Sequence, residues 1–174
     1  MKPVTLPLLQ QAANAFQFGG PLVCTLDHYG EGHINDTYMV WREDRSKRFI
    51  LQRINTDTFT DPVGLMENVC RVTRHLRAKI LAAGGDPMRE TLNVVPTLTG
   101  GSCYMDADGG AWRAYDFVEG TICLQQVGSE ADFCTVAETL GRFQNQLSDY
   151  PAATLHETIA RFHDTANRYA NFEK

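Results

Sequence analysis

A glycine-bearing turn between strand-like runs constrains the fold of this chain more than any other feature. The runs are rich in β-branched, aromatic and aliphatic residues, and they cover residues 22–29, 37–41 and 48–54. Between the first two runs, Gly30 and Gly32 permit positive φ angles and let the backbone approach a polyanion closely. The pattern predicts an antiparallel sheet whose first turn presents backbone N–H groups to phosphates. A glycine-rich hairpin that binds no ligand would show the same pattern.

Polar side chains are dense immediately after the two glycines. They are His33, Asn35, Asp36 and Thr37. A bare hairpin needs only one or two such residues at its turn. The surplus favours a binding loop, so we expect the glycines together with Asn35, Asp36 and Thr37 to contact a nucleotide.

The third strand-like run ends with two candidate ligand-facing side chains, Gln52 and Arg53. In kinase folds a cation on this strand pairs with the α/β-phosphates, and a glutamate on the following helix holds it. Arg53 and Glu67 are the available pair. Because side chains alternate along a strand, Gln52 and Arg53 cannot both face the ligand, and the sequence leaves that choice open. An exposed strand arginine and a solvated helix glutamate remain the alternative.

The segment from residue 112 to 120 runs from a strand into an acidic turn that ends at a glycine. In a kinase fold, the backbone C=O and N–H groups of such a segment read the edge of an adenine. We therefore expect Asp116 and Val118 to make backbone contacts with the nucleotide. A buried strand followed by an ordinary loop is the alternative.

Apolar periodicity and capping residues place the remaining elements. We expect helices over residues 5–18, from Asp61 to the glycines at 84 and 85, over 129–147, and from the 154–157 capping box through Tyr169. Further strands are expected at 93–96, 103–105 and 111–118, with a turn at Asp108-Gly109. The first part is thus predicted to be a helix-flanked antiparallel sheet and the second purely helical, with a boundary near Gly120.

Composition excludes several classes of protein. The net charge of −5 and the pI near 5.5 argue against a nucleic-acid surface. No run approaches the roughly 20 apolar residues of a membrane span, and the N-terminal residues do not form a secretory signal. The five cysteines, Cys123 among them, are scattered without C-x-x-C spacing. We expect a cytoplasmic protein whose partners are small molecules, with no nucleic-acid or membrane partner.

These segments, in this order and spacing, resemble the aminoglycoside phosphotransferase/choline kinase-like superfamily, and within it the N-acetylhexosamine 1-kinases. The resemblance covers nearly the whole chain. The residues that carry it are Gly32–Tyr38, Ile50–Asn55, Asp61-Pro62 with Leu65–Asn68, Gly84–Pro87 with Glu90–Leu92, Trp112-Arg113 with Phe117–Thr121, Gly141–Gln144, and Tyr150-Pro151 with Thr154–Thr158.

The resemblance implies an α+β fold, with a protein-kinase-like N-lobe over residues 1–118 and the first helices of an incomplete helical C-lobe over 119–174. It also implies ATP with Mg²⁺ as cofactors, an amino sugar as partner, and transfer of the γ-phosphoryl group to the anomeric hydroxyl of N-acetylglucosamine or N-acetylgalactosamine. It suggests that His33 lies near the sugar or the transferred phosphate.

Members of this superfamily carry a catalytic loop resembling H-x-D-x-x-x-x-N and a later metal-binding Asp, and neither motif occurs here. In the nearest lookalike, His163 and Asp164 are adjacent, and Tyr169 stands where the Asn is needed. We therefore expect no catalytic residue, no metal ligand and negligible turnover in these 174 residues. Three hypotheses follow: the N-terminal part of a sugar 1-kinase, a non-catalytic nucleotide-binding module, or part of a kinase for another alcohol, such as an aminoglycoside or choline.

Overall fold

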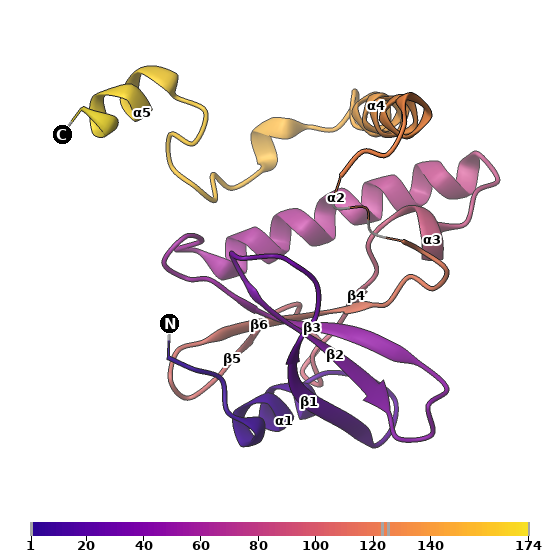
Figure 1. The fold of residues 1–174 in the computed structure, drawn as a ribbon, viewed down its shortest axis with the longest axis vertical. Helices are drawn as coiled ribbons and strands as arrows, with labels where there is room; N and C mark the ends of the chain where they lie inside the picture. The colour runs from indigo at the N-terminus through magenta and orange to yellow at the C-terminus, as the bar shows by residue number, and fades with distance from the viewer. Residues whose placement is uncertain (1, 123, 125, 174) are drawn as a thin grey trace.

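The computed structural model describes residues 2–122, 124 and 126–173, and its centre is a six-stranded antiparallel sheet. The strands are β1 (Leu22–His28), β2 (Asp36–Arg42), β3 (Arg48–Ile54), β4 (Val94–Val95), β5 (Tyr104–Met105) and β6 (Ala111–Asp116). Their order is β1-β2-β3-β6-β4, and β5 also pairs with β6. Figure 1 shows the sheet between helix α1 on one face and helix α2 on the other. The predicted antiparallel sheet with flanking helices is confirmed.

Helix α1 (Leu6–Asn14) covers one face of the sheet. The main core lies between them, where Leu9, Leu51 and Trp112 are fully buried. The helix ends earlier than the predicted residue 18. Phe16 and Phe18 enter the core instead, and the Gln17 N–H donates to the Pro96 carbonyl at 2.9 Å. These tertiary contacts replace the helical conformation that was predicted for residues 15–18.

Helix α2 (Pro62–Ala82) covers part of the opposite face. It begins as its sequence predicts, because the Asp61 side chain accepts a hydrogen bond from the Gly64 N–H at 2.8 Å and proline occupies the first turn. A second, smaller core forms where Met66 meets Ile54 and Ala111 of the sheet. The helix stops just before Gly84, whose φ of 77° suits glycine.

Two local features lie between α2 and β6. The short helix α3 (Pro87–Glu90) was not predicted, although Asp86 caps it and proline begins it, which is a recognisable start signal. The predicted turn at Asp108-Gly109 is confirmed. Asp106 organises it by accepting hydrogen bonds from Asp108 N, Gly110 N and the Trp112 indole.

The last third of the chain holds helix α4 (Glu130–Gln146), a 3₁₀ turn η1 (Ala152–Thr154) and helix α5 (Thr165–Phe172). Helix α4 agrees with its prediction. The predicted helix from residue 154 through Tyr169 is wrong, because regular structure resumes only at Thr165. The Thr154 carbonyl and the His156 backbone bind side chains of α2, which keeps these backbone groups out of helical hydrogen bonds.

Within the described residues, no helix is both long and apolar enough to cross a membrane. The cysteines of the described part, Cys24, Cys70, Cys103 and Cys134, are free thiols, and Cys123 lies outside it.

Candidate nucleotide site

The glycine loop joins β1 to β2 and leaves its backbone open. Gly30 has a φ of 82°, and a side chain added at Gly30 or Gly32 would meet no atom within 4 Å. His33 is exposed beside them. The base of the loop is closed by a hydrogen bond from Tyr29 N to the Thr37 carbonyl at 2.8 Å. The loop therefore combines a closed base with a tip that leaves room for a ligand.

Three of the four polar residues after the glycines tie the loop to β3 and its end. Asn35 Oδ1 accepts a hydrogen bond from Asn55 N at 2.9 Å. Thr37 Oγ1 accepts one from Gln52 Nε2 at 2.8 Å, and Asp36 forms an ion pair with Arg53. The polar side chains whose density suggested ligand binding therefore serve in large part to hold the loop in place.

Strand register separates the two candidate side chains of β3. Asp36, Arg53 and Trp112 form one cross-strand row, and Thr37, Gln52 and Arg113 form the next. Adjacent rows project to opposite faces of a sheet. Gln52 shares its face with α2, because its partner Arg113 places Nη1 3.9 Å from Met66 Sδ. Arg53 projects to the face that α1 covers.

Arg53 is a buried structural cation. Its Nε and Nη2 donate to Asp36 Oδ2 at 2.9 and 2.5 Å, and Nη2 also donates to the Lys2 carbonyl at 2.7 Å. Its side chain is 8% exposed. The predicted pairing of Arg53 with Glu67 is wrong, because the alternation of the strand directs Arg53 away from α2.

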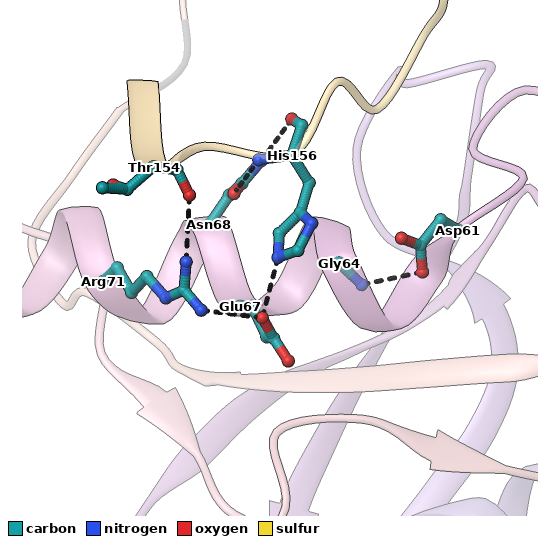
Figure 2. A network of polar contacts seen from close by, with 7 residues as sticks. All are labelled: Asp61, Gly64, Glu67, Asn68, Arg71, Thr154 and His156. Atoms are coloured by element: carbon teal, nitrogen blue, oxygen red, sulfur yellow. Dashed lines mark hydrogen bonds and ion pairs between the residues drawn. The ribbon is translucent and has the colours of Figure 1, made fainter. Parts of the chain in front are cut away.

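Glu67 is held by the far end of the chain instead. Figure 2 shows the network on the outer side of α2, where the Glu67 carboxylate meets Arg71 Nη2 at 2.9 Å and His156 Nε2 at 2.8 Å. The Asn68 side chain bonds both the N–H and the C=O of His156, each at 2.9 Å. Arg71 also donates to the Thr154 carbonyl at 3.0 Å. This face of α2 binds residues 154–156, at and after the end of η1, and not Arg53 of β3.

We call residues 117–121, which follow β6, the hinge segment. The Asp116 N–H is used within the sheet, where it donates to the Asn93 carbonyl at 2.9 Å. Val118 accepts a hydrogen bond from Thr121 Oγ1 at 3.0 Å, and its own N–H donates to no carbonyl among the described residues. The next residue, Glu119, is fixed by two arginines: Arg48 pairs with its carboxylate, and Arg89 donates to its carbonyl at 2.8 Å.

The base of the glycine loop contacts the segment after β6. The Tyr29 ring lies edge-on to the Phe117 ring with centroids 5.8 Å apart, and the Arg48 guanidinium lies 3.8 Å from the Phe117 centroid. Hydrogen bonds from Arg48 hold the pKa of the Glu119 carboxyl below its usual range. Arg48 therefore holds the segment after β6 through Phe117 and Glu119, and Tyr29 at the base of the glycine loop contacts the same segment.

The described residues fit a nucleotide better than they fit a metal. An open loop backbone and an unused hinge N–H are the groups that phosphates and an adenine edge require. Among the described residues, no three His, Cys, Asp and Glu side chains gather where they could hold a metal ion.

The antiparallel sheet with helices α1 and α2 on its two faces has the fold of a kinase-like N-lobe. No protein-family model matches the chain. Among solved structures, the chain is similar to an aminoglycoside phosphotransferase from Alicyclobacillus acidocaldarius, with a TM-score of 0.59 and 11% identity. The match covers 99% of this chain and 43% of that one, so this chain spans less than half the length of its structural neighbour.

Proposed function

We propose that this chain is the nucleotide-binding part of an ATP-dependent sugar kinase that resembles N-acetylhexosamine 1-kinase. The observation that carries the proposal is the placement of an open glycine loop beside a hinge with an unused Val118 N–H, within a kinase-like fold. The reaction of the complete enzyme would transfer the γ-phosphoryl group of ATP to the anomeric hydroxyl of an N-acetylhexosamine.

The residues of the site divide into two groups in this proposal. The backbone of Gly30 and Gly32 approaches the phosphates, and the backbone of Asp116 and Val118 receives the adenine. A second group holds the glycine loop in position: Asn35, Asp36, Thr37, Gln52 and Arg53. Glu67 instead pairs with Arg71 and His156 on the outer side of α2. The exposed His33 is the residue of this loop that we assign to the sugar or the transferred phosphate.

Phosphoryl transfer depends on positioning and on stabilising charge that develops in the transition state. The sequence has no H-x-D-x-x-x-x-N loop, and the described residues form no metal cluster. The proposal therefore assigns nucleotide binding to these residues and expects negligible turnover from them alone. A binding module without catalysis is the corresponding alternative.

The structural neighbour favours a second candidate for the acceptor. Its name identifies an aminoglycoside phosphotransferase, and aminoglycosides, like N-acetylhexosamines, offer sugar hydroxyls. A panel of N-acetylglucosamine, N-acetylgalactosamine, an aminoglycoside and choline, assayed with a complete enzyme containing this chain, decides between them. Phosphorylation of the aminoglycoside alone would replace the sugar-kinase proposal.

Nucleotide binding is tested directly by titrating ATP into the 174-residue chain in a calorimeter. We expect saturable binding that weakens in Gly30→Ala, because a side chain strains the positive φ that the loop requires. Gly100→Ala is the matched control, since Gly100 also has a positive φ and open space but lies in a different turn. Equal affinity in the two variants would contradict the role of the loop, and no binding by the unmodified chain would reject the proposal.

A further inference from the structure

Arg113 lies on the sheet face that carries α2, at the end of a row of hydrogen-bonded side chains. Its Nε donates to Gln52 Oε1 at 2.9 Å, and Gln52 Nε2 donates in turn to Thr37 Oγ1 at 2.8 Å. The Thr37 carbonyl closes the base of the glycine loop through Tyr29 N. A continuous chain of contacts therefore joins the Arg113 guanidinium to the loop proposed to hold the phosphates.

Arg113 differs from the other arginines in the strands in lacking a counter-ion. Arg42 pairs with Asp44, Arg48 with Glu119 and Arg53 with Asp36. Arg113 is half-buried, yet within the described residues it has no carboxylate partner within 4 Å. A partly desolvated cation without an anion carries an energetic penalty that an anionic ligand would relieve.

The neighbours of Arg113 orient the guanidinium without neutralising it. Met66 Sδ lies 3.9 Å from Nη1, and the Tyr115 ring centroid lies 5.3 Å from Cζ. Nη2 donates to no acceptor among the described residues. The planar guanidinium therefore retains donors, and such donors match the oxygens of a phosphate group.

We propose that Arg113, contributed by β6, is the cation that binds the phosphates of the nucleotide, in the role that sequence reasoning assigned to Arg53. Gln52 occupies the ligand-facing position of β3 and acts as a positioning residue between Arg113 and the glycine loop. This inference rests on the proposed nucleotide binding and extends it by naming the residue that recognises the phosphate charge.

The test compares ATP with adenosine, which lacks phosphates, as ligands of the 174-residue chain. Loss of a charge-assisted contact predicts a roughly 10- to 100-fold weaker affinity for ATP in Arg113→Gln, with adenosine affinity unchanged. Arg113→Lys keeps the charge and should recover part of the loss. Arg74→Gln is the matched control, since it removes the same charge from an exposed position on α2.

The outcomes separate this inference from the function on which it rests. If the unmodified chain binds both ligands and Arg113→Gln binds ATP as tightly as Arg74→Gln does, only the assignment of Arg113 is overturned. If the unmodified chain binds neither ligand, the proposed nucleotide binding fails and this inference fails with it.

A measurement on the unmodified chain covers the case in which Arg113→Gln does not fold. Phenylglyoxal modifies accessible guanidinium groups, and mass spectrometry locates the modified residues. We expect ATP, and not adenosine, to protect Arg113, while Arg74 reacts equally in all samples. Equal reaction of Arg113 with and without ATP would overturn the proposal.

Discussion

Helices α2 and α4 show the same apolar periodicity but differ in what covers it. Helix α2 buries Gly64, Met66, Leu76 and Ile80. Helix α4 has no buried residue among those described, and its Phe133 and Val136 are each 63% exposed. The two helices differ in their surroundings. The sheet packs against the apolar stripe of α2, whereas no described part of the chain buries the apolar stripe of α4.

This comparison teaches that an amphipathic pattern predicts a helix without predicting its burial. The free energy of burial depends on apolar area removed from water, so an exposed stripe contributes little to folding. Both core clusters lie within residues 9–114, in the sheet, its two covering helices and adjoining loops. We therefore expect the stability of the chain to reside in this part, and three predictions test the contrast.

The largest effect is expected from a pair of leucine truncations. Leu51 is fully buried in β3, and Leu140 of α4 is 55% exposed. Leu51→Ala should lower the free energy of unfolding by about 2–5 kcal/mol, and Leu140→Ala by less than about 0.5 kcal/mol. Urea titration followed by circular dichroism measures both. Comparable losses in the two variants would show that α4 is packed in solution.

An intermediate effect is expected at the ion pair behind the glycine loop. Arg53→Met leaves the Asp36 carboxylate partly buried without its partner, which should cost about 2–3 kcal/mol. The double variant Asp36→Asn, Arg53→Met should recover part of this loss, since the uncompensated charge is removed. Thermal and urea unfolding of the single and double variants give the coupling energy. A double variant no more stable than Arg53→Met would contradict a specific role for the pair.

The smallest effect is expected where the two parts of the chain join. The Asn68 side chain holds the backbone of His156 through two exposed hydrogen bonds. Asn68→Ala should cost about 1 kcal/mol or less, and the change should be local. Hydrogen exchange should accelerate at residues 154–156 and remain unchanged in β3. Asn167→Ala in α5 is the control variant. Faster hydrogen exchange throughout the sheet in Asn68→Ala would show that this contact supports the core.

Much of the fold was predictable, since it follows from local rules. Asp61 and Pro62 begin α2, Ser129 caps α4, and the three runs around the glycine loop became β1, β2 and β3. The strand at 111–118 was predicted with an end two residues beyond the observed Asp116. The helix predicted from residue 154 failed because side chains of α2 bind the Thr154 carbonyl and the His156 backbone.

The candidate site was predictable in location and not in pairing. Backbone at the glycine loop and after β6 stays a prediction as a nucleotide site, whereas the register shows that Arg53 projects away from α2 and that Gln52 and Arg113 share the face that α2 covers. Trp112 and Arg113 are among the residues that carry the family resemblance. The sequence does not indicate which residue of β3 lies opposite each of them. That information is contained in the register of β3 against β6.

The amino-acid sequence by itself determined the local conformations, because caps, glycines at positive φ and alternating apolar residues act over a few neighbouring positions. The tertiary structure alone decided which side chains meet. Strand register set Arg53 against Asp36 and Gln52 against Arg113, and the docking of residues 154–156 directed Glu67 away from the sheet. Such pairings join residues up to 89 positions apart, where contacts depend on how whole elements pack and not on local preference.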